Sequence, residues 1–275
     1  MISTLAVWEY NPQPAKRLGA LRKQLQISQG TAELVARAGF ECPDSARGFL
    51  YPRLSQISCP FEIPRLQEAA ERICQALDHG QRIVICGDYD VDGVTSTALL
   101  VDFLQQFGNY PKFIVPLRLE EGYGLSQRTA ERAMDCGEKA DLFIALDCGT
   151  NSVDEAEYIH SQGCDLIIVD HHQAKGDLPE GAILLNPHLH PDEGEPWRNL
   201  CTAGLAFKLI HGLLKHLREK NVERAFEVDP KESLALSALG TIADLVPLNM
   251  ENRIIARFGL KHLGHNPSQL VVHFV

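Results

Sequence analysis

The stretch that decides the fold is Arg82-Ile83-Val84-Ile85-Cys86-Gly87-Asp88-Tyr89-Asp90-Val91-Asp92-Gly93, an apolar run followed by alternating aspartates. A short apolar run bounded by polar turn residues predicts a buried parallel strand. Two further runs are of this kind: Leu142–Leu146 precedes Asp147, and Leu166–Val169 precedes Asp170-His171-His172. Ligands of open parallel sheets bind beyond the carboxyl ends of the strands, so we expect these side chains to face one crevice.

The residue types in this crevice predict a divalent metal site. Carboxylate oxygen and imidazole nitrogen suit Mn²⁺, Mg²⁺ or Zn²⁺, and without a cation the clustered carboxylates would repel one another. The alternative for Asp90 and Asp92 is that they cap the next helix and interact with its dipole. Asp88 is either a ligand or the residue that orients the turn. Asp147 taken alone would be read as a turn residue that caps a helix.

The segment Asp170-His171-His172 is the strongest local signal. Adjacent histidines cannot easily face one ion from an extended chain, so we expect one to bind metal and the other to face a substrate. The alternative is a pair of surface histidines in a loop. Asp244 lies in the apolar stretch Ala238–Leu248 and needs a partner if it is buried and charged. A metal ion would supply one, and a C-terminal helix cap is the alternative. No comparable pattern surrounds His188, His190, His211 and His216, which are interpreted as loop or helix-surface residues.

Outward from the first strand, the chain alternates between strand and helix patterns. Strands are predicted at 82–87, 112–117, 142–147, 166–170 and 183–185, and helices at 63–79, 95–107, 127–136 and 152–162. Such alternation predicts an α/β fold with a parallel β-sheet flanked by helices. A C-terminal helical segment follows, at 203–217, 231–242 and 252–263. We expect an N-terminal helical arm at 1–62, a catalytic domain at 63–263 and an atypical tail at 264–275.

Bulk properties limit the class of protein. The 275 residues carry a formal net charge of −10, which argues against a generally basic nucleic-acid binder. Bound divalent ions and a local basic groove would weaken that argument. The eight cysteines form no C-x-x-C pair, so we expect a reducing, cytoplasmic environment. No apolar run is long enough to span a bilayer, and we expect no membrane partner.

The motifs resemble those of the DHH phosphoesterase superfamily: Asp90-x-Asp92, a later Asp147, Asp170-His171-His172 and a final Asp244. The similarity is closest to its RecJ-like exonucleases. It lies in Gly87–Ser96, in Glu120-Glu121-Gly122-Tyr123-Gly124-Leu125-Ser126 and in Ala238–Leu248, and it covers about 50–263. It implies a single-stranded-DNA-specific 5′–3′ exonuclease of DNA repair and recombination that uses two Mn²⁺ or Mg²⁺ ions.

The resemblance also implies roles for individual residues. Two metal ions would be held by Asp90, Asp92, Asp147, His171 and Asp244, with Asp147 bridging and His172 facing the scissile phosphate. Many family members carry a histidine where this chain has Cys86, so the first metal is expected to use Asp88 as well. Water would attack phosphorus in line with the leaving oxygen. Contacts to the phosphate backbone are expected from Ser96, Arg118, Thr202 and Gly204. Tyr123 is expected to stack on a base, or else to pack in its turn.

Two other functions stay open at this point. The first is a phosphoesterase on short oligonucleotides or cyclic dinucleotides, and the second is a non-catalytic DHH scaffold module. RecJ-like enzymes continue into a DHH-associated C-terminal domain and an OB-fold, which supply much of the DNA groove. We expect both to be absent from this chain, and we therefore expect a weakly active form. The sequence does not identify partner proteins in repair.

Overall fold

The computed structural model describes residues 13–117, 124–135, 139–191 and 194–265, and it divides into two compact units, Met1–Arg53 and Leu54–Val275. The first unit holds three short helices, α1 (Ala15–Leu25), α2 (Gln29–Arg37) and α3 (Pro43–Leu50). They enclose a small core of Leu21, Leu25, Ala32, Val35, Ala36 and Ala46. The predicted helical character of the N-terminal part is confirmed.

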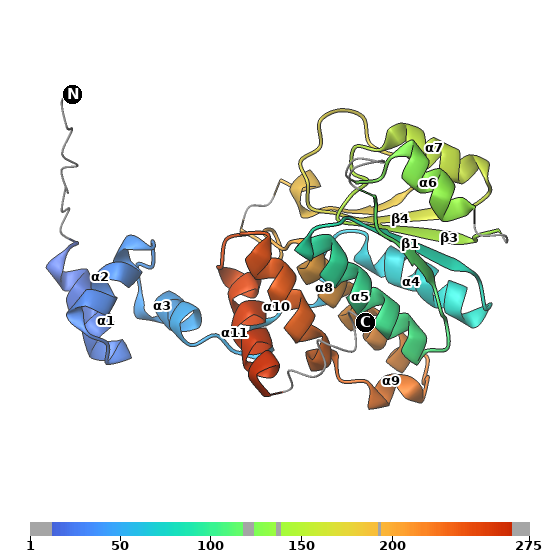
Figure 1. Ribbon diagram of the computed structural model, residues 1–275. Helices are drawn as coiled ribbons and strands as arrows, with labels where there is room; N and C mark the ends of the chain where they lie inside the picture. The colour runs from blue at the N-terminus through green and yellow to red at the C-terminus, as the bar shows by residue number, and fades with distance from the viewer. Residues whose placement is uncertain (1–12, 118–123, 136–138, 192–193, 266–275) are drawn as a thin grey trace, which may run out of the picture. The chain divides into compact units, whose positions relative to one another are not determined.

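The second unit is built on a parallel sheet of five strands in the order β2-β1-β3-β4-β5 (Figure 1). The strands are β1 (Ile83–Gly87), β2 (Lys112–Ile114), β3 (Leu142–Leu146), β4 (Asp165–Val169) and β5 (Ile183–Leu185). Strand order reverses between β1 and β3, because the chain adds β2 on one side of β1 and later strands on the other. The crevice of such a sheet lies at this reversal.

Both faces of the sheet are buried, and side chains of one strand alternate between them. In β3, Leu142, Ile144 and Leu146 join the larger core, whereas Phe143 and Ala145 join the smaller one. Helices α4 (Leu66–Asp78), α5 (Val91–Gln106) and α8 (Thr202–Glu219) cover the first face. The second is covered by α6 (Gln127–Met134) and α7 (Val153–Ser161) (Figure 1). Burial on both faces explains the nearly continuous apolar strand sequences.

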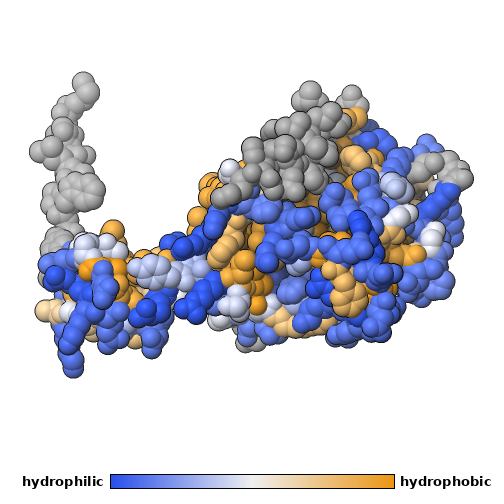
Figure 2. Space-filling view, turned by 90° about the horizontal axis from the view of Figure 1, so that it is seen from below, coloured by the Kyte–Doolittle hydropathy of each residue, from blue (hydrophilic) through white to orange (hydrophobic). Residues whose placement is uncertain are grey.

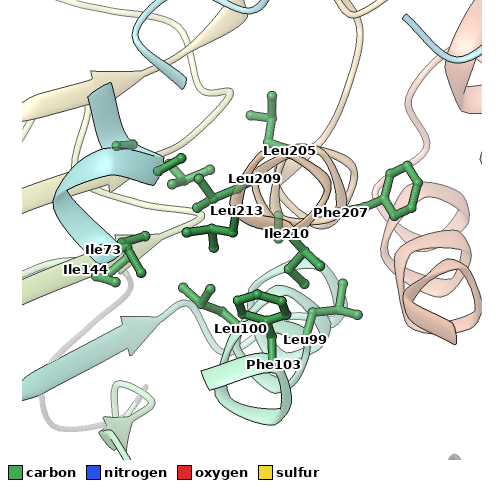
Figure 3. Packing of buried hydrophobic residues seen from close by; sticks show 14 of the residues in the cluster. Ile73, Leu99, Leu100, Phe103, Ile144, Leu205, Phe207, Leu209, Ile210 and Leu213 are labelled. Atoms are coloured by element: carbon green, nitrogen blue, oxygen red, sulfur yellow. The ribbon is translucent and has the colours of Figure 1, made fainter. Parts of the chain in front are cut away.

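Helix α8 forms the centre of the larger core. Leu205, Leu209 and Leu213 follow one another along one side of the helix and pack toward α4, α5 and the sheet (Figure 3). Helix α10 (Leu234–Ala243) packs on α5, α8 and α11 (Met250–His265). The smaller elements are α9 (Arg224–Glu227) and the 3-10 turns η1 (Leu54–Gln56), η2 (Pro60–Glu62), η3 (Pro187–Leu189) and η4 (Pro230–Ser233).

A buried ion pair fastens α11 to α8. The Lys208 ammonium lies 3.0 Å from Glu251 Oε2, and both side chains are almost completely buried. Ser58 forms hydrogen bonds with both members of the pair. Lys208 Nζ donates to the carbonyl and hydroxyl oxygens of Ser58, and the backbone N–H of Ser58 donates to Glu251 Oε1. Burial lowers the pKa of Lys208 in spite of the nearby carboxylate.

The predicted parallel sheet and its flanking helices are confirmed, with shifts at element ends. Helix α5 begins at Val91 rather than Thr95, since the Asp90 carboxylate accepts the Gly93 N–H and starts the helix earlier. Strand β2 ends at Ile114 instead of continuing to residue 117. The helix expected from Lys231 starts at Leu234, because Pro230–Ser233 forms a 3-10 turn.

Hydrophilic residues predominate on the face of the molecule in Figure 2, with apolar side chains scattered among them. Among the described residues, no helix combines the length and the hydrophobicity needed to cross a bilayer.

Candidate metal centre

The carboxyl ends of three adjacent strands and the end of α10 meet at one point. Asp92 lies in the first turn of α5 directly after β1, Asp147 follows β3, and His171 follows β4. Asp244 is the C-terminal cap of α10, and its N–H donates to the Gly240 carbonyl. The juxtaposition predicted from the ends of the apolar runs is therefore present, and Asp244 is part of it.

The imidazole of His171 is the centre of this arrangement. Its Nε2 lies 3.4 Å from Asp147 Oδ1, 3.6 Å from Asp92 Oδ2 and 3.6 Å from Asp244 Oδ2. This nitrogen is buried and has no hydrogen-bond partner among the described residues. A buried polar atom without a partner, surrounded by carboxylates, is the environment that a divalent cation would satisfy.

Two overlapping groups of three donors meet the distance requirement for an ion. One contains Asp147, His171 and His172, the other Asp92, His171 and Asp244, and within each group the ligand atoms lie within 4.8 Å of one another. Asp90 is not in either group. It caps α5 through Oδ1, and its negative charge raises the pKa values of Asp147 and Asp244.

The electrostatics of the site favour a bound cation. Burial, followed by the charges of Asp92 and Asp90, raises the pKa of Asp147 to about 10. Burial also raises the pKa of Asp244. Carboxylates that resist ionisation when crowded and desolvated become anionic ligands once a metal ion supplies the opposing charge. The residues present therefore fit a divalent ion with oxygen and nitrogen ligands.

Backbone geometry at the end of β3 aims Asp147 into the site. Asp147 has a φ of 64°, a left-handed conformation that is uncommon for a residue with a side chain. The residue is 1% exposed, and its N–H is fixed by the Val169 carbonyl at the end of β4. Strain of this kind persists only where surrounding contacts impose it, and it is concentrated at functional sites.

Asp170 does not point at the cluster but holds the two histidines. Its Oδ1 accepts the backbone N–H groups of His171 and His172, and it lies 2.7 Å from His172 Nδ1. Burial opposes ionisation of Asp170, but its hydrogen bonds and the His172 charge outweigh burial and lower its pKa. The same hydrogen bond raises the pKa of His172. The His172 side chain is 56% exposed and is therefore accessible from solvent.

A second layer of buried polar residues supports this turn. Asn186, at the end of β5, donates from Nδ2 to the His172 carbonyl at 2.8 Å and to Thr150 Oγ1 at 2.9 Å. Thr150 in turn donates its N–H to Asp170 Oδ2. Sequence reasoning missed Asn186 and Thr150. Their positions just after predicted strands were the available signal, but neither belongs to a residue type that marks a metal site.

The first turn of α8 contacts two of the clustered carboxylates. The backbone N–H groups of Thr202 and Ala203 donate to Asp92 Oδ2 and Oδ1, at 2.7 and 2.8 Å. The Thr202 hydroxyl donates to Asp147 Oδ1 at 3.0 Å. Thr202 is completely buried, so the structure places it against the acidic residues and does not present it to a substrate.

The other residues predicted for this site have different positions. Asp88 Oδ1 accepts the backbone N–H groups of Tyr89 and Gly124, so one of its oxygens orients the turn. Ser96 is completely buried and donates to the Gly93 carbonyl, and Gly204 packs on the Leu200 side chain. The structure therefore does not bring Ser96 and Gly204 to the surface of the site. Arg118 and Tyr123 lie outside the described residues.

Comparison with known proteins places these motifs in a wider group. Residues 82–241 match the family model described as the DHH family, N-terminal domain. Among curated proteins, the single-stranded-DNA-specific exonuclease RecJ of Bacillus subtilis is 38% identical over 263 residues, which is 96% of this chain and 32% of that protein. RecJ of Escherichia coli is 34% identical over 251 residues, covering 90% of this chain and 41% of that protein. The chain thus spans well under half the length of these relatives.

Solved structures of RecJ are also similar to this chain. The crystal structure of exonuclease RecJ bound to manganese has a TM-score of 0.65 and 34% identity, over 76% of this chain and 49% of that one. The Thermus thermophilus RecJ in complex with Mn²⁺ has a TM-score of 0.72 and 30% identity, over 90% of this chain and 33% of that one.

Proposed function

Because this chain belongs to the DHH family, we propose that it hydrolyses phosphodiester bonds in single-stranded DNA with the help of two Mn²⁺ or Mg²⁺ ions. The observation that carries the proposal is the His171 Nε2 atom, which is buried without a hydrogen-bond partner 3.4 to 3.6 Å from three carboxylates. The similarity to RecJ, a single-stranded-DNA-specific exonuclease, supports single-stranded DNA as the substrate. The similarity to RecJ crystal structures that contain Mn²⁺ supports Mn²⁺ as the ion.

The ions would be held by Asp90, Asp92, Asp147, His171 and Asp244, of which all but Asp90 lie in the two groups of donors. Asp88 Oδ1 accepts two backbone N–H groups and orients the turn, and its second oxygen would remain for an ion. Divalent ions bound in this way would polarise the phosphate and make water a stronger nucleophile. The chain itself supplies anionic ligands in fixed positions, and it excludes water from Asp92 and Asp147, which are each 1% exposed.

His172 would act on the substrate side. Asp170 holds its Nδ1, so the ring is oriented with its other nitrogen available to a phosphate oxygen, and the hydrogen bond to Asp170 favours the protonated ring. A positively charged imidazole beside the scissile phosphate would stabilise charge that develops on its oxygens.

We infer a cellular setting from the same resemblance. RecJ-like activity on single strands points to DNA repair and recombination. All seven cysteines in the described part of the chain are free thiols, which is typical of proteins from a reducing compartment such as the cytoplasm.

The test is a length-resolved gel of end-labelled single-stranded DNA incubated with the protein and Mn²⁺. We expect products that shorten with time, with label at the 5′ end released first, and no reaction in the presence of a chelator. Absence of hydrolysis on every single-stranded substrate, with Mn²⁺ bound, would favour a non-catalytic scaffold instead.

The net charge of −10 favours a second candidate, hydrolysis of short oligonucleotides. A long strand is held through many phosphate contacts whose strength falls with salt, and an acidic chain offers little attraction for a polyanion. We expect a faster rate on a short oligonucleotide than on a long strand, compared at two salt concentrations. Rapid, processive digestion of the long strand would contradict this second candidate.

A further inference from the structure

The first turn of α8 binds both oxygens of one acidic side chain and one oxygen of another. Asp92 accepts the Thr202 and Ala203 N–H groups, one on each carboxylate oxygen, while Asp147 accepts the Thr202 hydroxyl. Asp92 and Asp147 are 1% exposed and Thr202 is 0% exposed. These hydrogen bonds are shielded from water, and they hold the two carboxylates in their present orientation.

These hydrogen bonds leave the carboxylates free toward His171. Each carboxylate oxygen has two lone pairs, and the α8 donors occupy one on each oxygen of Asp92. The Asp147 oxygen that accepts the Thr202 hydroxyl is also the oxygen 3.4 Å from His171 Nε2. The Asp92 oxygen that accepts the Thr202 N–H is the one 3.6 Å from the same nitrogen. Thr202 therefore orients the two oxygens that face the centre of the site.

Helix α10 keeps this turn in place. A Cβ added at Gly240 would lie 2.5 Å from Ala203 Cβ and 2.8 Å from Asp92 Oδ1. The Ser237 hydroxyl also donates to the Ala203 carbonyl at 3.1 Å. The absence of a side chain at Gly240 thus lets α10 pack closely against Ala203 and Asp92, which holds the first turn of α8 beside the Asp92 carboxylate.

We propose that Thr202 is a positioning residue that presets Asp92 and Asp147 for cation binding and thereby determines metal affinity. Its hydroxyl acts through Asp147 and does not touch the substrate. This inference rests on the proposed function, because it assumes that the clustered residues hold divalent ions. It replaces the phosphate contact that the sequence predicts for Thr202.

The test is calorimetric titration with Mn²⁺ in the absence of nucleic acid, which reads metal binding directly. Thr202→Val keeps the shape of the side chain and removes the hydroxyl, so we expect Mn²⁺ affinity at the tighter site to fall about 10- to 100-fold, as is usual when an outer hydrogen bond to a ligand is lost. Thr202→Ser retains the hydroxyl and should restore nearly wild-type affinity. Thr202→Ala provides a second removal of the hydroxyl if the valine variant does not fold.

Thr129→Val is the matched control. Thr129 is also completely buried, but its hydroxyl lies 2.8 Å from Ser126 Oγ in the first turn of α6, and we expect its loss to leave Mn²⁺ affinity unchanged. Wild-type affinity in both Thr202→Val and Thr202→Ala, with weaker DNA binding, would overturn the positioning role and restore the substrate contact. A wild-type protein that binds no Mn²⁺ would instead overturn the proposed function, and this inference with it.

Discussion

At the scale of single residues, the site depends on carboxylates that are buried before any counter-charge is present. Asp147 is the extreme case, with a left-handed backbone, 1% exposure and a raised pKa. We expect Asp147→Ala to lower the rate of phosphodiester hydrolysis by at least about 100-fold, because it removes a buried anionic ligand of the proposed metal site. Rates on labelled single-stranded DNA measure this loss.

The matched control for that variant is Asp165→Ala. Asp165 lies at the opposite end of the sheet, where its carboxylate pairs with Arg72 at the surface. Its removal should change the rate little, so a comparable loss in both variants would show that the Asp147 effect is not specific to the site.

The two adjacent histidines are expected to differ in function. His171 lies among three carboxylates, whereas His172 is held by Asp170 and is 56% exposed. We expect His172→Ala to lower turnover by about 100-fold or more while Mn²⁺ affinity changes little. Single-turnover rates and calorimetric titration give the two quantities. A variant that loses metal affinity in proportion to its rate would show that the roles of the histidines are exchanged.

At the scale of elements, α11 is held by an ion pair whose members are almost completely buried. We expect Glu251→Gln to destabilise the fold by about 3–5 kcal/mol, because it leaves the Lys208 ammonium buried without a full counter-charge. Chemical denaturation measures the change. In Lys220→Met, which breaks an exposed pair with Asp78, the change should be below about 1 kcal/mol. Equal effects in the two variants would contradict the assignment of a buried pair.

Sequence patterns predict the elements that end in the site but not the contacts between them. The apolar runs give β1, β3 and β4, and the aspartates and histidines after them give Asp92, Asp147 and His171. The role of Thr202 could not be predicted, because its hydrogen bonds join residues that are 110 and 55 positions away. Asn186 is likewise recognised only by its distance to the His172 carbonyl. His211, interpreted as a loop or helix-surface residue, is partly buried in α8, where its ring centroid lies 6.4 Å from that of Phe207.

At the scale of the whole molecule, we expect His211 to make stability depend on pH. Burial, followed by the charge of Lys208, lowers the pKa of His211 to about 4, and its Nδ1 is buried without a partner among the described residues. An unfolded histidine takes up a proton near its ordinary pKa of about 6.5. Between these two values the unfolded chain binds more protons, so this contribution to stability falls as the pH drops from about 7 to about 4.

We expect His211→Asn to flatten this decline by on the order of 1 kcal/mol, after allowance for solvent screening. Denaturant titrations at several pH values, compared with wild type, isolate the contribution of His211 from those of the acidic cluster. The matching substitution of the exposed His79 should leave the slope as it is. An unchanged slope in His211→Asn would show that the buried ring does not control the dependence.

The residues of the metal centre, Asp92, Asp147, His171 and Asp244, are far apart in the sequence. Domains generally fold as units, and during synthesis the N-terminal part of a chain is made first. Strands β1, β3 and β4, which precede Asp92, Asp147 and His171, are synthesised first, and helix α10, which precedes Asp244, is synthesised later. A nascent chain therefore displays an incomplete chelator for part of its synthesis. We therefore expect tight binding of a divalent ion only after translation has passed Asp244, since Asp244 belongs to one of the two groups of donors.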